Sequence, residues 1–346
     1  MTIVEAARAV TGGVDTHLDV NVAAALDDIG GLLGVEEFST DSAGHRLLLI
    51  WLRSFGTVSL VGVEGTGSYG VGLARWLRAA GVAVVEVDRP NRLVRRRQGK
   101  SDPVDAVEAA RAAQSGRASG QGKSRDGNVE AIRALTIAKR SARSTKVKSL
   151  NQIRHLGFCA PDPLRQRFQG LSRTAIAGEA AALRPRADGD AVLFATKTAM
   201  RLLGRRVLSL DDEKAELDKL MGELVAKTAP ELLAVFGVGV DTAAILLVAA
   251  GDNPERLRGE AAWAHLCGVS PIEASSGKVV RRRLNRSGDR QANHALWRIA
   301  ITRMSSDPRT RDYVTRRLEE GKRKPEIIRM LKRYITREVY RHLPRS

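Results

Sequence analysis

Residues 10–120 contain apolar, valine-rich segments that constrain the fold more than any other feature of the chain. The segments cover residues 10–28, 57–65 and 82–88, and each is bounded by glycines and charged residues. Short apolar segments of this kind are typical of strands in a covered sheet. The N-terminal third is therefore predicted to contain a buried sheet.

Helical spacing separates these apolar segments. Residues 41–54 place apolar side chains at helical intervals, with Asp41 or Ser42 as a suitable N-cap. Residues 70–81 form a second helical pattern, which ends at a glycine. Because the predicted strands and helices alternate, we expect an α/β domain.

Four acidic residues lie where these predicted elements begin or end, namely Asp15, Glu64, Asp102 and Asp105. If the strands that carry Asp15 and Glu64 are neighbours, their carboxylates emerge near one edge of the sheet. The chain has a formal net charge of +18, so a group of carboxylates is best explained as a set of ligands for Mg²⁺, or for Mn²⁺. A basic surface around an acidic site suits metal-dependent phosphodiester chemistry on nucleic acid.

Asp102 and Asp105 lie three residues apart at the start of a predicted helix. Pro103 fits the first helical position, so we expect Asp102 to be the N-cap and Asp105 to lie in the first turn. Negative charge is favourable there because of the helix dipole. An Asp102 that only caps the helix is the alternative interpretation.

A second interpretation of the N-terminal third concerns residues 65–70, GTGSYG, which form a GxGxxG pattern between a predicted strand and a predicted helix. Asp88 follows at about the distance of a ribose-binding acid. However, the dinucleotide fingerprint normally opens its fold, whereas a strand–helix unit already precedes this one. Dinucleotide binding also leaves the basic C-terminal region unexplained.

Composition narrows the class of protein further. Lys and Arg number 57 against 39 Asp and Glu, which indicates nucleic acid or an anionic membrane as a partner. No apolar run approaches the length of a membrane span, and the N-terminus lacks a signal-peptide pattern, so we expect no membrane partner. Cys159 and Cys267 lack close cysteine neighbours, which suits a reducing cytoplasm. The six histidines show no ligand-like spacing, and we interpret them as ordinary surface or core residues.

The middle of the chain is predicted to be helical. Residues 115–128 are rich in Gly, Ser and charge and are the candidate linker. Long helical patterns follow over 129–155 and 194–227. The second carries a partial leucine stripe that suggests a coiled-coil-like arm, formed by Leu208, Leu210, Leu217, Leu220 and Leu224. The first is strongly basic, and we expect it to contact nucleic-acid backbone through Lys139, Arg140, Arg143 and Lys146.

The last part of the chain differs from the rest in its glycine motif and in its charge. Residues 231–252 place GVG between two apolar helical segments, a pattern that resembles a helix-hairpin-helix. A tight helix–helix turn without a ligand explains this motif equally well. Residues 278–346 contain 21 Lys and Arg against 7 Asp and Glu, so most of the excess charge lies here. We expect nucleic-acid contacts from Lys278, Arg281, Arg282, Arg283, Arg286 and Arg290.

Two serines precede this cationic run. Ser275 and Ser276 lie directly before Gly277, and a serine beside guanidinium groups is well placed to attack a phosphodiester. An ordinary surface loop explains the same residues, because loop serines rarely catalyse.

The ordered motifs resemble those of the DEDD transposases of the insertion sequence 110 family over nearly the whole chain. The matching segments are, in order, GVDTH, VGVEGTGSYG, KSDPVDA, FGVGVDTAAILLVAAGD, WAHLCGVSP, SSG and RSGDRQANHALWRIA. The resemblance implies an RNase H-like, resolvase-like domain over residues 1–120. It also implies a helical, coiled-coil region over 121–228 and a mostly helical transposase domain over 229–346.

The resemblance also implies chemistry and partners. Asp15, Glu64, Asp102 and Asp105 would bind Mg²⁺, and a serine would become covalently linked to DNA. By its position five residues after the proline of GVSP, that serine is Ser276, with Ser275 as the alternative. A structured noncoding RNA from the element would pair with donor and target DNA. The active site would be shared between protomers, which requires at least a dimer and favours a tetramer.

From these observations we expect a bacterial, cytoplasmic and nucleoid-associated recombinase that excises and inserts its own mobile element. The alternative is a Mg²⁺-dependent nuclease or Holliday-junction resolvase that uses the four acids and water, without a covalent intermediate. A noncatalytic nucleic-acid binder is the third interpretation.

Overall fold

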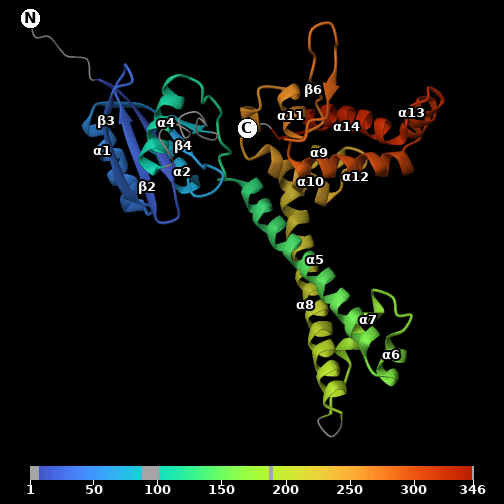
Figure 1. Ribbon diagram of the computed structural model, residues 1–346. Coiled ribbons are helices and arrows are strands. Elements are labelled where there is room, and N and C mark those ends of the chain that lie inside the picture. Colours follow the sequence, from blue (N-terminus) through green and yellow to red (C-terminus); the bar gives the residue numbers. More distant parts are fainter. Residues whose placement is uncertain (1–7, 88–100, 187–189, 345–346) are drawn as a thin grey trace, which may run out of the picture. The chain divides into compact units, whose positions relative to one another are not determined.

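The structure, a computed structural model, describes residues 8–87, 101–186 and 190–344. The chain divides into two compact units (Figure 1). The N-terminal unit comprises the chain up to Gly127 together with Ala250–Gly259, and the helical unit comprises Asn128–Ala249 and Glu260–Pro344. The three-part division expected from the sequence, with boundaries after residues 120 and 228, stays a prediction.

A five-stranded mixed sheet forms the centre of the N-terminal unit. Its strands are β1 Ala9–Thr16, β2 Val20–Leu26, β3 Leu32–Ser39, β4 Thr57–Glu64 and β5 Val84–Val87. They lie in the order β3-β2-β1-β4-β5. β2 is antiparallel to β1 and β3, whereas β4 is parallel to both β1 and β5. The α/β prediction is confirmed, and the strand order is consistent with an RNase H-like domain.

Helices cover both faces of this sheet. α1 (Ser42–Ser54) and α2 (Val71–Ala79) share a core with Ala23 and Ala25 of β2, whereas α4 (Asp102–Gln114) packs against Val22 and Ala24. Successive side chains of a strand point to opposite faces, so α4 lies on the other face from α1 and α2. Figure 1 shows α4 crossing the sheet.

The contact between α4 and β1 is unusually close. A Cβ on Gly13 would lie 2.1 Å from the Ala110 nitrogen and 2.3 Å from the Ala106 oxygen. On β4, a Cβ on Gly62 would lie 2.7 Å from the Ala109 oxygen. The alanine-rich helix therefore rests directly on the strand backbone, and this contact determines how near the start of α4 comes to the end of β1.

The start of α4 differs from the prediction by one residue. Ser101, not Asp102, is the N-cap, and its carbonyl accepts from the Asp105 N–H at 3.0 Å. Asp102 is the first helical residue and its carboxylate points to His17 rather than to the helix backbone. Asp105 lies in the first turn, as expected. By contrast, the N-cap of α1 is Asp41, one of the two expected residues, which accepts from the Gly44 N–H.

The predicted linker is anchored to the N-terminal unit by a distant segment. The Ser124 N–H donates to Asn253 Oδ1 at 3.0 Å, and Asn253 Nδ2 donates to the Gly122 carbonyl at 3.1 Å. Asn253 precedes η1 (Pro254–Arg256) in the segment that returns to this unit. Sequence reasoning did not foresee this return, because one asparagine in a polar loop carries no signal of its distant partner.

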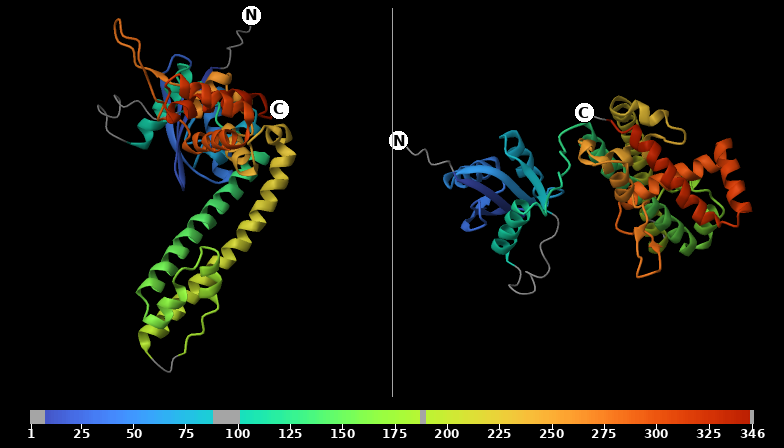
Figure 2. Two further views of the ribbon diagram at one scale, coloured as in Figure 1. Left: turned by 90° about the vertical axis from the view of Figure 1, so that its right-hand side faces the viewer. Right: turned by 90° about the horizontal axis from the view of Figure 1, so that it is seen from above.

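Two long helices form an arm in the helical unit, and both were predicted. α5 (Asn128–Cys159) and α8 (Ala191–Thr228) lie side by side, as Figure 1 and the left view of Figure 2 show. The short helices α6 (Asp162–Phe168) and α7 (Ala175–Ala181) pack at the end of this pair and share a core with it.

The predicted leucine stripe of α8 is wrong in part. Leu217 is buried, but Leu208 is 43% exposed and Leu220 is 40% exposed. The buried face is instead formed by Met200, Gly204, Val207, Leu217, Met221 and Val225. Gly204 lies on this face because α7 packs closely there: a Cβ on Gly204 would lie 2.5 Å from the Ala181 nitrogen.

The rest of the helical unit is a group of helices with one small hairpin. Its elements are α9 Pro230–Ala234, α10 Val240–Ala250, α11 Glu260–Leu266, β6 Ile272–Glu273, β7 Arg282–Arg283, α12 Arg290–Ser306, α13 Pro308–Glu319 and α14 Lys324–Arg341. The GVG motif forms the turn between α9 and α10, with Gly237 at a φ of +81°. None of the helices described is long and apolar enough to cross a membrane.

The close contact at Gly13 generates a prediction. Gly13→Ala should destabilise the protein strongly, by roughly 3 kcal/mol or more, because the new methyl group meets helix backbone that cannot move aside. Gly12→Ala is the control: its Cβ would meet the ends of Leu52 and Val61 side chains at 3.0–3.3 Å, and its cost should be about 1 kcal/mol. Thermal and denaturant unfolding measure both, and equal costs would contradict the packing described.

Candidate metal centre and serine hairpin

Asp15 and Glu64 lie at the same edge of the sheet. β1 and β4 are parallel, and Val14 pairs with Val63, so the next residues of both strands reach the same level. The Thr16 hydroxyl donates to the Glu64 carbonyl at 2.8 Å and joins the two strand ends. Strand pairing thus places the two acids as the sequence predicted.

A group of ligand atoms converges at this edge. Asp15 Oδ2 lies 3.2 Å from His17 Nε2, and that nitrogen lies 3.5 Å from Asp102 Oδ1. One ligand atom from each of the three residues falls within 4.8 Å of the others. Asp102 reaches this position because α4 packs on β1, whereas His17 lies in the turn that leads to β2. Glu64 and Asp105 are not among these three ligand residues.

Asp105 adds negative charge close to Asp15. Its side chain is buried in the first turn of α4, at 2% exposure. Burial raises the pKa of Asp15, and the negative charges of Asp105 and Asp102 raise it further, while His17 lowers it. The carboxylates therefore repel one another, and a cation bound between them would relieve that repulsion.

These residues fit a divalent ion. Asp15 and Asp102 offer carboxylate oxygens, which Mg²⁺ and Mn²⁺ prefer, and His17 offers an imidazole nitrogen, which suits Mn²⁺ better than Mg²⁺. Asp102 is half exposed, so one side of the group is open to solvent and to a phosphate oxygen. Sequence reasoning missed His17 as part of this group. The available signal was its position two residues after Asp15, directly after the end of the strand, because alternate side chains of an extended segment lie on one face.

The GTGSYG segment is packed in a way that does not suit a dinucleotide. Thr66 is buried and its hydroxyl donates to Glu86. The linker covers it, because a Cβ on Gly122 would lie 2.8 Å from the Thr66 hydroxyl oxygen. In addition, the antiparallel β1-β2-β3 arrangement differs from the mostly parallel dinucleotide-binding sheet. Asp88, the proposed ribose ligand, lies outside the described residues.

Ser276 lies at the tip of the hairpin formed by β6 and β7, which we call the serine hairpin (residues 272–283). Ser276 and Val279 exchange two backbone hydrogen bonds of 3.1 Å, so Gly277 and Lys278 form a two-residue turn. Gly277 has a φ of +55°, whereas Lys278 is not among the residues with a positive φ, and a positive value at the first central position alone is the pattern of a type II′ turn. The glycine after the serine is thus required by the turn.

The two candidate serines differ in their hydrogen bonds. The Ser275 hydroxyl accepts from the Arg281 N–H at 3.2 Å and lies 3.4 Å from its carbonyl, so it is engaged across the hairpin. Within the described residues, no hydrogen bond engages the hydroxyl of Ser276. Both serines are exposed, as are the arginines at 281–283.

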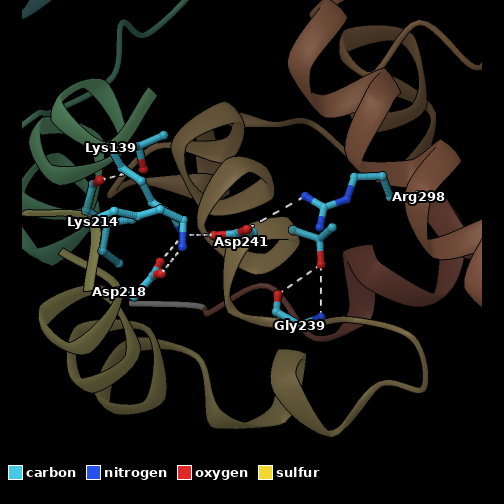
Figure 3. A network of polar contacts seen from close by, with 9 residues as sticks. Lys139, Lys214, Asp218, Gly239, Asp241 and Arg298 are labelled. Atoms are coloured by element: carbon cyan, nitrogen blue, oxygen red, sulfur yellow. Dashed lines mark hydrogen bonds and ion pairs between the residues drawn. The ribbon is translucent and has the colours of Figure 1, made fainter. Parts of the chain in front are cut away.

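The basic residues of α5 fall into two groups. Arg140 and Arg143 are exposed. Lys139 is half-buried and its ammonium bonds Asp218 and Asp241 (Figure 3), and Lys146 is paired with Asp211. Arg298 Nη1 lies 3.8 Å from Asp241 Oδ2, an ion pair that Figure 3 also shows. The two lysines therefore join α5 to α8 and α10, and the exposed arginines are better placed to contact a ligand.

Comparison with known proteins adds the family. A transposase family model of the DEDD IS110 type matches residues 12–156, which include Asp15, Glu64, Asp102 and Asp105. A second, described as the transposase IS116/IS110/IS902 family, matches residues 229–315, which include Ser276. The chain belongs to the IS110 transposase family.

Two relatives of this IS110-family chain are products of insertion elements. An uncharacterized 43.6 kDa protein of insertion element IS110 from Streptomyces coelicolor is 35% identical over 106 residues, covering 30% of this chain and 26% of the relative. An uncharacterized 42 kDa protein of insertion element IS900 from Mycobacterium paratuberculosis is 27% identical over 139 residues, covering 39% and 35%. The matches thus span about a quarter and a third of the relatives' lengths.

The carboxylate group generates a prediction about metal and pH. In the IS110-family chain, Mn²⁺ should raise the unfolding temperature, and Asp15→Asn should abolish that shift while stabilising the metal-free protein, because repulsion is removed. The raised pKa means that folding favours protonated Asp15. Stability without metal should therefore fall as pH rises from the ordinary value of 3.8 through the raised one.

The control for this prediction is Asp19→Asn, which removes an exposed acid of the same turn. It should keep the full Mn²⁺ shift. Calorimetry at several pH values provides both readouts, and a shift that survives Asp15→Asn would remove this residue from the metal site.

Proposed function

We propose that this chain is a site-specific DNA recombinase that excises and inserts its own mobile element. The convergence of Asp15, Asp102 and the buried Asp105 at one edge of a sheet with RNase H-like strand order carries the proposal. The exposed serine hairpin with its arginines and the two matched transposase segments support it further.

The proposed reaction begins at Ser276. Its hydroxyl oxygen attacks a DNA phosphorus, a serine–phosphate bond forms, and the bond to one sugar oxygen breaks. The serine proton is lost to a base or solvent, and the leaving sugar oxygen takes up a proton and becomes a free hydroxyl. An exchanged hydroxyl then attacks the phosphoserine, which restores a phosphodiester and the serine.

Asp15, Glu64, Asp102 and Asp105 would hold Mg²⁺ or Mn²⁺, with His17 as a further ligand. Such an ion, when bound, neutralises charge on the phosphate and on the leaving oxygen. The exposed arginines of the serine hairpin would orient the phosphate and balance its added negative charge. Ser276 is preferred over Ser275 because the Ser275 hydroxyl is engaged with the Arg281 backbone.

The proposal includes two partners beside DNA. A structured noncoding RNA of the element would select donor and target sequences by base pairing, with Arg140 and Arg143 of the arm among its backbone contacts. A second copy of the chain would complete the active site, with the acids supplied by one protomer and the serine by another. A dimer is the smallest assembly that allows this exchange, and synapsis of two DNA sites favours a tetramer.

One observation favours a second candidate function. The carboxylate group is complete within the N-terminal unit and needs no residue of the serine hairpin. A metal-dependent nuclease or junction resolvase that uses water would therefore operate with the same acids. The covalent step distinguishes the two functions.

An adduct assay tests the proposal. Purified protein, RNA transcribed from the element's flanks, matching labelled DNA and Mg²⁺ should give a DNA-linked protein band on a denaturing gel. Ser276→Ala and Asp105→Ala should each reduce that band to below about one part in a thousand of the wild-type yield. Omission of the RNA should remove it for the matching DNA.

Ser275→Ala is the matched control, since it changes the neighbouring serine and should leave the band largely intact. Cleaved DNA without an adduct, unaffected by either serine substitution, would establish the nuclease instead. A band lost only with Ser275→Ala would reassign the nucleophile.

A further inference from the structure

A cavity of about 760 Å³ lies at the base of the serine hairpin. Residues 268–271, which lead into β6, form one wall, and residues 284–290, which follow β7, form another. One face of α14 closes the cavity. Two of the motifs identified in the sequence, WAHLCGVSP and RSGDRQANHALWRIA, thus meet here, and the proposed reaction gives this meeting point no role.

The two loops support each other by direct backbone contact. A Cβ on Gly288 would lie 2.4 Å from the Gly268 Cα, so only glycine fits at this crossing. Asn285 Nδ2 donates to the His265 carbonyl at 2.9 Å, and Asn293 Nδ2 donates to the Cys267 carbonyl at 2.8 Å. These bonds hold the walls in place before any ligand arrives, as expected of a preformed binding site.

Among the described residues that line the cavity, six are cationic and none is acidic. The cationic side chains are Arg286, Arg290, Arg329, Lys332, Arg333 and Arg337. Arg333 is neutralised by Glu260, to which it makes a two-pronged contact. In the part of the chain that the structure describes, the other five make no ion pair with a carboxylate. Several positive charges therefore face one space without a counterion.

Lys332 is the cation of this cavity whose surroundings are best defined. It is half-buried, and its ammonium donates to Asn293 Oδ1 at 2.8 Å. This acceptor is uncharged, and Asn293 is held in that orientation by its own bond to Cys267. Burial lowers the pKa of Lys332, and the neighbouring charge of Arg329 lowers it further. An ammonium has three donors, so an anion in the cavity would satisfy the donors that Asn293 leaves over.

The remaining wall is apolar. Val269, Leu284, Met330 and the ring of Tyr334, which is 51% exposed, line the same space. Inorganic phosphate would use only the cationic part, whereas a nucleotide would use both, with its phosphate on the cations and its sugar and base on the apolar side chains. A fully paired duplex cannot place a base in a cavity of this size.

We infer that this cavity binds one unpaired nucleotide of a nucleic-acid strand, with its phosphate on Lys332 and the rim arginines. The inference rests on the proposed function in one respect only, namely that nucleic acid is the partner. A nucleotide held here would fix the strand next to the base of the serine hairpin. The unpaired nucleotide comes from DNA or from RNA, which share this chemistry, and the experiment separates the two.

The test compares two lysines of α14 in the full-length protein. Lys332→Met removes the cavity ammonium, and Lys324→Met removes one exposed charge from the same helix outside the cavity. Fluorescence anisotropy measures Kd over a range of salt for three labelled probes: single-stranded DNA, RNA of the same sequence, and the paired DNA duplex. If Lys332→Met folds poorly, Arg329→Gln takes its place in the comparison, because Arg329 is exposed at the rim of the cavity.

Lys332→Met should raise Kd for a single-stranded probe several-fold more than Lys324→Met. It should also reduce the slope of log Kd against log salt by about 0.7, the value for one phosphate contact on a single strand. If Lys332→Met weakens binding of the DNA probe alone or of the RNA probe alone, the result supports the inference and identifies the nucleic acid that supplies the nucleotide. Weaker binding of both single-stranded probes also supports it and shows that the cavity recognises the phosphate that DNA and RNA share.

An equal change of Kd in the two lysine variants would overturn the inference. An equal loss of affinity of Lys332→Met for the duplex and for the single strands would also overturn it, because a paired strand has no nucleotide to insert. These outcomes are independent of the adduct assay. A wild-type protein that binds the probes but forms no adduct counts against the recombinase alone. An adduct that forms normally in Lys332→Met, with unchanged binding, counts against the cavity alone.

Discussion

The close packing of α4 on β1 is the contact on which the N-terminal unit depends. Because Gly13 has no side chain, the helix backbone comes near enough to the strand for the first turn of α4 to approach the strand end. Asp102 and Asp105 thereby approach Asp15, and His17 joins them from the following turn. The same packing creates the repulsion that raises the pKa of Asp15. The arrangement of carboxylates that would favour binding of a cation therefore lowers the stability of this edge in the metal-free protein.

The proposed nucleophile is held in a different way. The acids sit on buried, regular elements, whereas Ser276 sits on an exposed two-stranded hairpin whose tip depends on one glycine turn. A short hairpin has little stability of its own, so its geometry depends on what holds its base. That base is the crossing of Gly268 and Gly288 beside the cationic cavity. A bound nucleotide would therefore stabilise both the nucleic-acid strand and the hairpin that carries the proposed nucleophile.

Sequence reasoning succeeded where the signal is local. The helices of the arm, the cap at Asp41 and the placement of Asp15 and Glu64 at one edge all follow from periodicity or strand pairing. It failed where a distant partner decides. The leucines at 208 and 220 of α8 look like a coiled-coil stripe, but α5 and α7 pack on the neighbouring face, where glycine and methionine fit.

The sequence by itself determined the α/β class, the location of the four acids at the ends of strands or the start of a helix, the long helices and the excess of positive charge in the last part of the chain. Only the tertiary structure decided that His17 faces Asp102, that the linker binds Asn253, and that Lys332 shares a cavity with the loops around the serine hairpin. The physical reason is the range of the interactions. Helix caps, strand alternation and net charge are set by neighbouring residues, whereas a metal or anion site is assembled by packing between segments far apart in the chain.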